Sequence, residues 1–376
     1  MRDQNKAKKK RASASARARG HEDTPILPPP PERRGRAAKS RFQPVPPERM
    51  PRFAGVPTFL RLPITAEEGP VPKVDVLLCG VPLDAGTNFR AGARFGPRAV
   101  RDASALSRRF SAALGVDIYE ELEVADGGDV AVTPHDIGQA LSSVAARAES
   151  IVRSGAVGGF IGGDQTVTLG VLRGIHRAKL RSVGLLHIDA HSNTCRSSWG
   201  QDVHHESVIR NAVEEGLVRP DRVLQMGIRG PYSSAEDMDF ALSSGFEIVK
   251  IDDLRWDLHG AISQLRRFVG QGSIYVSVDV CALDPAFAPG VGTPSPGGMS
   301  IWELQQILRA LVGAEIVGFD LVEIAPPYDR TGVTALAGVS TLQEILAALA
   351  DTRRSARSAP SSRAPGSVRR GRRRSA

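Results

Sequence analysis

The segment SVGLLHIDAHSN, residues 182–193, joins an apolar run to a cluster of polar residues. Residues 182–189 have the pattern of a strand that is buried on both faces, and the cluster begins where this run ends. Alternate side chains of a strand point to the same side, so Asp189 and His191 are expected to face one point. The segment therefore predicts a buried strand that ends at a candidate ligand-binding site.

Similar apolar runs recur along the chain and alternate with helical patterns. The predicted strands are 74–80, 156–163, 182–189, 222–229, 273–280 and 315–324. Residues 136–155 have an apolar face at helical spacing, and residues 300–311 begin with Ser300 and Glu303 in capping-box positions. This alternation predicts an α/β fold with a mainly parallel sheet covered on both faces. In such a sheet, ligands bind beyond the carboxyl ends of the strands.

Two more predicted strands lead into polar clusters. One cluster is Gly162–Thr166, and the other begins with Asp279 and Cys281. Alone, Asp189 or His191 would be interpreted as a satisfied buried polar group, and Cys281 as a small core residue. The double glycine lacks the Gly-Lys-Ser/Thr ending of a phosphate loop. Carboxylates and an imidazole at three strand ends together predict a site for a divalent metal.

The charge of the chain is divided unevenly along its 376 residues. Residues 1–52 hold 15 Lys and Arg against 5 Asp and Glu, and residues 351–376 hold 9 Arg against 1 Asp. The total charge is +8, so residues 53–350 carry a net charge of −10. Both tails are poor in large apolar residues, which predicts that they are disordered and that 53–350 is a single folded domain. Such tails also suit a nuclear signal, a transit peptide or an arm that contacts nucleic acid or another polyanion.

Three observations bear on the compartment. The three cysteines, Cys79, Cys195 and Cys281, are too few and too scattered for a disulfide framework, which favours a cytoplasmic location. No uninterrupted apolar run approaches the roughly 20 residues that span a bilayer, so no membrane partner is expected. The start of the chain has no apolar signal region, which argues against secretion.

Motifs across residues 78–347 resemble the ureohydrolase family of arginases, agmatinases and guanidino-acid hydrolases, and most closely its agmatinase-like branch. They are GVPLDAGT (80–87), RFGPR (94–98), DGGDV (126–130), AVEEGL (212–217), GIRG (227–230), DPAFAPGVGTPSPGG (284–298) and VEIAPPYD (322–329). The resemblance implies a three-layer α/β/α arginase-type fold and a homo-oligomer, a trimer or hexamer. It also implies hydrolysis of a small guanidino substrate to urea and an amine.

The family binds two Mn²⁺ ions through six ligands, and this chain matches half of them. By resemblance, Asp189 and Asp279 would bridge both ions and His191 would bind one of them. The other three positions hold Gln165, Asn193 and Cys281, where the family has His, Asp and Asp. Removing half of the counter-charge makes two adjacent dications unfavourable. We therefore expect one divalent metal on Asp189, His191, Asp279 and Cys281, with Zn²⁺ favoured by the thiolate.

The resemblance also gives roles to the rest of the site. Glu323 corresponds to the carboxylate that pairs with the substrate guanidinium, and His205 to a proton-shuttling histidine. The family usually has glycine after this histidine, where this chain has Glu206. Asp164 and Thr166 would support the position that Gln165 now occupies.

Three hypotheses remain open from the sequence. The first is an agmatinase-like amidinohydrolase that works with one metal or an altered metal. The second is a catalytically inactive relative that acts as a binding or regulatory protein. The third is association with nucleic acid or another polyanion through the basic tails. The sequence does not name the substrate, whose specificity is expected to lie in the loops 84–94, 193–204 and 230–238.

Overall fold

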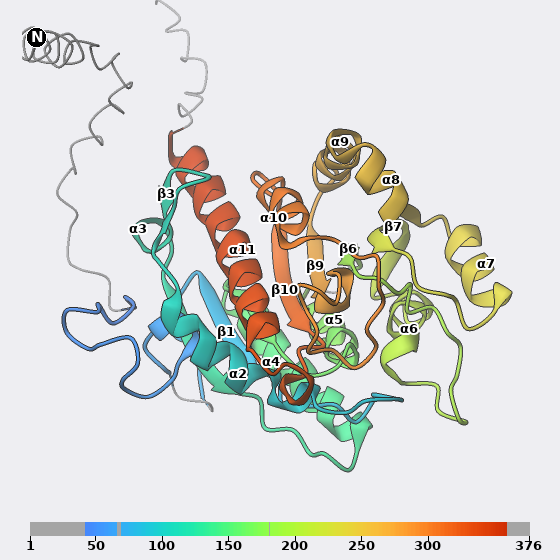
Figure 1. Ribbon diagram of the computed structural model, residues 1–376, viewed down its shortest axis with the longest axis horizontal. Coiled ribbons are helices and arrows are strands. Elements are labelled where there is room, and N and C mark those ends of the chain that lie inside the picture. The colour runs from blue at the N-terminus through green and yellow to red at the C-terminus, as the bar shows by residue number, and fades with distance from the viewer. Residues whose placement is uncertain (1–41, 66–68, 180, 359–376) are drawn as a thin grey trace, which may run out of the picture. The chain divides into compact units, whose positions relative to one another are not determined.

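The computed structural model describes residues 42–65, 69–179 and 181–358, and its centre is an eight-stranded parallel sheet (Figure 1). All seven pairings between neighbouring strands of this sheet are parallel. In sheet order the strands are β4 (Val124–Asp129), β1 (Val76–Gly80), β5 (Val157–Ile161), β10 (Ile316–Val322), β9 (Ile274–Asp279), β6 (Val183–Ile188), β7 (Val218–Ile228) and β8 (Glu247–Lys250). A separate antiparallel pair joins β2 (Phe110–Ser111) to β3 (Val116–Asp117).

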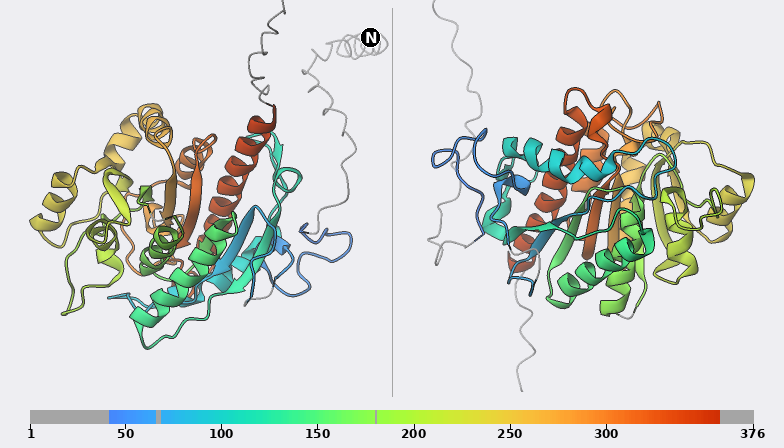
Figure 2. Two further views of the ribbon diagram at one scale, coloured as in Figure 1. Left: turned by 180° about the vertical axis from the view of Figure 1, so that it is seen from behind. Right: turned by 90° about the horizontal axis from the view of Figure 1, so that it is seen from below.

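Helices cover both faces of the sheet, as Figure 2 shows from two directions. One apolar core lies between the sheet and the group α2 (Gly96–Ala103), α8 (Ile251–Trp256), α9 (Leu258–Val269), α10 (Ile301–Arg309) and α11 (Val333–Ser358). The other lies under α4 (Ile137–Arg153), α5 (Thr166–Lys179), α6 (Val208–Glu214) and α7 (Ala235–Ser243). A short helix, α3 (Ile118–Glu121), follows β3. Strand β1 serves both cores, with Leu78 in the first and Leu77 in the second. The expected three-layer α/β/α fold with a mainly parallel sheet is confirmed.

All six predicted strands are present; two strands of the large sheet, β4 and β8, and the short pair β2 and β3 were missed. Strand β4 was missed because VADGGD is rich in glycine and aspartate, which disfavour strands. It is stabilised by pairing with β1 and by Arg101, whose guanidinium binds Asp126. Strand β8 has only four residues at the edge of the sheet. The predicted capping box of α10 is present, since Ser300 and Glu303 bond to each other's backbone N–H groups.

The folded domain extends beyond both expected boundaries, 53 and 350, which is a correction. At the start, Phe42 is buried and Gln43 Nε2 donates a hydrogen bond to the Tyr119 carbonyl. At the end, α11 continues to Ser358, and Arg354 donates to the carbonyls of Leu114 and Gly115. These contacts fix segments whose composition alone predicts disorder. The expected disorder of the outer tails falls on residues 1–41 and 359–376, which lie outside the described residues.

One described helix, α11, is long and apolar enough to cross a membrane by length and composition. The sequence analysis predicted that no segment is long and apolar enough to span a bilayer, and α11 shows that this prediction is wrong. The prediction considered only uninterrupted apolar runs. However, 67% of the apolar window of α11 is buried inside the protein. Such burial is typical of a core helix, and α11 packs against α10, α2 and α3.

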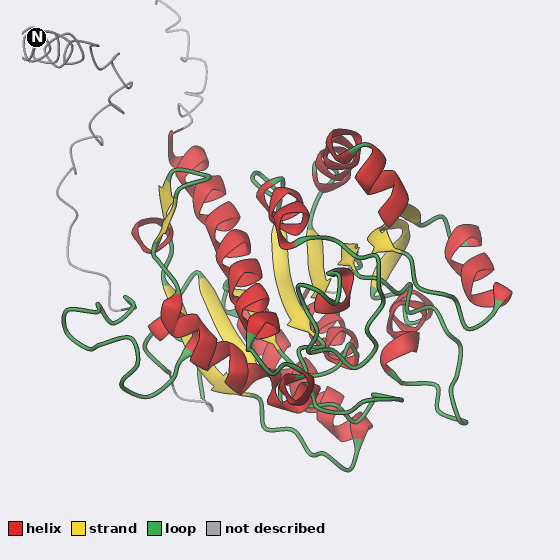
Figure 3. Cartoon of the chain, in the orientation of Figure 1, coloured by secondary structure: helices red, strands yellow, loops and turns green. Residues whose placement is uncertain are grey.

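Four adjacent strands end at the place where the sequence predicts the site. In sheet order these are β5, β10, β9 and β6. Figure 3 draws the strands of the sheet in yellow and the loops that leave them in green. Gln165 follows β5, Glu323 follows β10, and Asp279 ends β9. Asp189 follows β6, so four of the predicted positions meet at one edge because their strands are neighbours.

Candidate functional site

Glu323 directly follows β10, and its side-chain carboxylate is buried in the site. Its side chain is 1% exposed, and its φ of 66° is in the left-handed region that non-glycine residues rarely adopt. Oε1 accepts a hydrogen bond from the Gln165 backbone N–H at 3.0 Å and lies 3.2 Å from His205 Nδ1. Oε2 has no hydrogen-bond partner among the described residues. Contacts at Oε1 therefore fix the Glu323 carboxylate, and Oε2 can accept a hydrogen bond from a ligand.

His205 is held between Glu323 and the loop that follows β1. Its Nε2 lies 2.8 Å from Asn88 Oδ1, so both ring nitrogens face acceptor oxygens. Burial lowers the pKa of His205, but the hydrogen bond and charge of Glu323 outweigh it and raise the pKa to about 9. The imidazole is therefore held in its protonated form at neutral pH.

This raised pKa predicts a pH-dependent contribution to stability. A histidine whose folded-state pKa exceeds its unfolded value stabilises the fold below about pH 6.5, and this stabilisation is lost as pH rises through about 9. We expect the free energy of unfolding of the wild type to exceed that of His205→Gln at pH 6, by an amount that shrinks by a few kcal/mol at pH 10. Urea unfolding of both proteins at several pH values measures this difference. An unchanging difference would show that folding does not raise the pKa of His205.

Asp164 and Thr166 support the loop after β1. Asp164 Oδ2 accepts the Gly86 N–H at 2.7 Å, and Oδ1 accepts the N–H and hydroxyl of Thr166. Burial, followed by the nearby charge of Glu323, raises the pKa of Asp164 to about 6. The pair connects the end of β5 to the loop that carries Asn88.

Asp189 is surrounded by nitrogen atoms of its own chain. Asn193 Nδ2 donates to Oδ2 at 2.8 Å, and His187 Nε2 lies 3.2 Å from the same oxygen. Oδ1 accepts the His191 backbone N–H at 3.1 Å and lies 3.3 Å from His191 Nδ1. Burial alone would raise the pKa of Asp189, but the close His187 and His191 side chains lower this pKa well below its usual range. The Asn193 amide thus supplies a proton donor to Asp189 instead of the second carboxylate found in the related family.

The Gln165 side chain is directed into the sheet. Nε2 donates to Thr168 Oγ1 at 2.8 Å and to Ser277 Oγ at 2.9 Å, and both hydroxyls donate in turn to the buried Asp320. The Gln165 amide oxygen has no partner among the described residues. This position therefore extends a buried hydrogen-bond network under the site.

Asp279 and Cys281 form the remaining acidic part of the site. The Cys281 N–H donates to Asp279 Oδ1 at 2.6 Å, and both side chains are buried. Burial and then the charges of Asp189 and Glu323 raise the pKa of Asp279 well above its usual value. As these side chains lie, no three His, Cys, Asp or Glu residues within 42–65, 69–179 and 181–358 are arranged to hold a metal ion.

Two residues of the site were not predicted from the sequence. His187 lies two positions before Asp189 in β6, and the period-two rule could have placed it on the same side of the strand. Asn88 contacts His205 across 117 residues of sequence, and no local pattern indicates such a contact.

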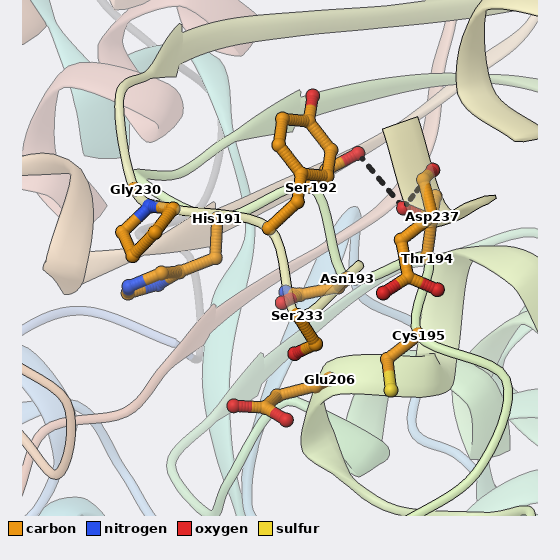
Figure 4. A pocket seen from close by; sticks show the side chains of 11 residues that line it. His191, Ser192, Asn193, Thr194, Cys195, Glu206, Gly230, Ser233 and Asp237 are labelled. Carbon is orange, nitrogen blue, oxygen red and sulfur yellow. Dashed lines mark hydrogen bonds between the residues drawn. The ribbon is translucent and has the colours of Figure 1, made fainter. Parts of the chain in front are cut away.

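A pocket opens outward from His191 and Asn193 (Figure 4). It holds about 340 Å³ of empty space, including space open to solvent. Its lining comes from the segment after β6, η4 (His205–Ser207), the loop after β7 and the first turn of α7: His191, Ser192, Asn193, Thr194, Cys195, Glu206, Gly230, Pro231, Tyr232, Ser233 and Asp237. Two of the predicted specificity loops, 193–204 and 230–238, contribute to this lining, and the loop 84–94 does not.

Comparisons with known proteins agree with this architecture. Residues 74–348 match the Arginase family. The chain is 39% identical to a guanidinobutyrase of Pseudomonas aeruginosa over 83% of this chain and 98% of that protein. It is also 39% identical to a mitochondrial agmatinase of Gallus gallus, over 82% and 91% of the two chains. Among solved structures, proclavaminate amidinohydrolase from Streptomyces clavuligerus matches with a TM-score of 0.76 and 34% identity, covering 80% of this chain and 99% of that chain. The chain therefore belongs to the arginase family.

Proposed function

We propose that this protein hydrolyses a small guanidino compound to urea and an amine. The relatives named guanidinobutyrase, agmatinase and proclavaminate amidinohydrolase support an amidinohydrolase activity. The single observation that carries the proposal in this chain is the buried Glu323 carboxylate with one oxygen left unpaired.

Glu323 suits a guanidinium ligand in charge and geometry. A carboxylate matches the planar guanidinium with strong charge-assisted hydrogen bonds, and an unpaired buried oxygen gains most from a donor. Gly292 lies beside this oxygen: a β-carbon added there would be 3.6 Å from Glu323 Oε2 and 3.0 Å from the Arg90 carbonyl oxygen, so a side chain at this position would crowd the approach to Oε2. His205, protonated on both ring nitrogens, is placed to give a proton to the departing amine.

The donor set does not fit two metal ions. Asn193 and Gln165 present amides where the family has ionised or imidazole ligands, and the Asn193 amide is bonded to Asp189. The donor types fit one ion better, because Asp189, Asp279, Cys281 and His191 combine two carboxylates, a thiol and an imidazole. Burial and then the charges of Asp189 and Glu323 raise the pKa of Asp279, and a cation beside these acids would offset both effects. Binding of an ion requires Asn193 to release Asp189. An ion held there would supply an activated water nucleophile.

We expect about one divalent ion per chain after purification without added metal, and no second ion after loading with Mn²⁺ or Zn²⁺. Elemental analysis measures the stoichiometry, and urea release from a panel of guanidino compounds measures the activity. Two ions per chain would contradict the charge argument. No ion under any loading condition would contradict the hydrolase proposal.

A second candidate is a guanidinium-binding protein without turnover. The observation that favours it is the set of internal bonds made by Asn193 and Gln165, which satisfy Asp189 and the buried network without a metal. Calorimetric binding of a guanidino compound to metal-free protein, with no urea formed after loading, would support this candidate. Binding that requires the metal would argue against it.

Other features remain predictions of this proposal. They are a trimeric or hexameric assembly, a cytoplasmic location and contact of the basic tails with nucleic acid or another polyanion. The tail sequences that carry the last prediction fall mostly in residues 1–41 and 359–376.

A further inference from the structure

The pocket beside His191 is lined by acidic side chains. Its two carboxylates are Asp237 and Glu206, and no Lys or Arg is among its lining residues. Asp237 lies 3.7 Å from Arg210, which is buried and also donates to the Thr194 carbonyl. Glu206 makes no side-chain hydrogen bond or ion pair with any other residue in the described ranges. Glu206 is therefore the carboxylate of this lining that pairs with no Lys or Arg among the described residues.

The arginines near this pocket, Arg229 and Arg196, already form hydrogen bonds or ion pairs with other residues. Arg229 donates to the carbonyls of Cys281, Ala282 and Ser295, among others. Arg196 pairs with Glu236, and both side chains are mostly exposed. Each of these guanidinium groups would have to break its existing contacts to meet a carboxylate in the pocket.

Glu206 is adjacent in the sequence to a residue that contacts Glu323. It directly follows His205, whose ring lies 3.2 Å from Glu323, and consecutive Cα atoms are about 3.8 Å apart. His205 directs its ring inward to Glu323, and Glu206 lines the pocket beside Asn193, Cys195 and Ser233 (Figure 4). The two neighbouring side chains therefore face the buried carboxylate and the pocket, respectively.

We propose that Glu206 selects guanidino compounds whose far end carries a cation, such as an amine, over those that end in a carboxylate. This inference rests on the proposed function, because it assumes that the guanidinium lies at Glu323. In the pocket, a tail ammonium would gain the Glu206 charge, whereas a tail carboxylate would meet it as a like charge. The family resemblance places glycine at this position, so the selection is a property of this chain's own residue.

The test uses three ligands with the same guanidinium and different tails. They are agmatine with an amine tail, butylguanidine with an uncharged tail and 4-guanidinobutyrate with a carboxylate tail. We expect the full-length protein to prefer agmatine over 4-guanidinobutyrate by about tenfold or more, in kcat/KM and in calorimetric affinity. Glu206→Gln is expected to reduce this preference several-fold and to leave the affinity for butylguanidine unchanged.

Glu236→Gln is the matched control, since it removes one carboxylate close to the pocket that does not line it. It should keep the preference of the wild type. Equal or tighter binding of 4-guanidinobutyrate, or a preference unaffected by Glu206→Gln, would overturn the selection by Glu206. If no compound is hydrolysed but affinities still follow the tail charge and Glu206, the hydrolase proposal fails and the selection stands. If none of the three ligands binds, both fail.

Discussion

Replacement of Glu323 by glutamine is expected to lower kcat/KM for the guanidino substrate by about 100-fold to 1,000-fold. The carboxylate is buried, and its unpaired oxygen is the one placed to accept a guanidinium N–H. Glutamine has the same shape but is neutral, and it can present an N–H group where the substrate also has N–H groups. Steady-state kinetics and calorimetric affinity for the same compound measure the loss.

The variant also loses the contact between Glu323 and His205, so its stability must be measured separately. Glu344→Gln provides a matched control, because Glu344 is a mostly buried carboxylate of α11 that pairs with Arg309. It is expected to lower the free energy of unfolding without changing kcat/KM per folded chain. A Glu323→Gln protein that binds and turns over substrate like the wild type would place the guanidinium elsewhere.

The same physical signals that predicted the fold from the sequence also limited the prediction. Apolar runs identified the six strands whose side chains pack into the two cores, since burial on both faces leaves a clear pattern. Strand β4 lacks this pattern, and its stability comes from Arg101 on Asp126 and from pairing with β1. Such long-range contacts have no local signature in the sequence.

The sequence predicted which residues form the candidate site, but it did not predict the hydrogen bonds between them. The strand-end rule placed Asp189 and Asp279 together, because β6 and β9 are neighbours in the sheet, and the family resemblance added Glu323. It could not show that Asn193 donates to Asp189, or that Gln165 turns into the network below. Amide side chains both donate and accept, so only the surrounding atoms decide which bonds they form.

A triple variant that restores the family's ligand types, Gln165→His, Asn193→Asp and Cys281→Asp, is expected to bind about two divalent ions per chain and to raise kcat by about 100-fold or more. The changes add an imidazole and two carboxylates around Asp189 and Asp279, which compensates the charge of a second dication. They also remove the Asn193 N–H that now occupies Asp189 Oδ2. Elemental analysis and urea release after Mn²⁺ loading measure both effects.

The single variants distinguish charge from ligand count. Asn193→Asp alone puts a second carboxylate beside Asp189 in place of a donor, so the metal-free protein should be less stable than the wild type and should regain stability with Mn²⁺. Gln165→His alone gives up the bonds to Thr168 and Ser277 without adding negative charge, so it should not bind a second ion. If the triple variant folds but binds no more metal than the wild type, these three residues are not what limits the site. If it binds two ions and remains inactive, the metal ligands are not what limits the activity. The His205–Asn88 contact or the pocket residue Glu206 is then the next part of the site to change.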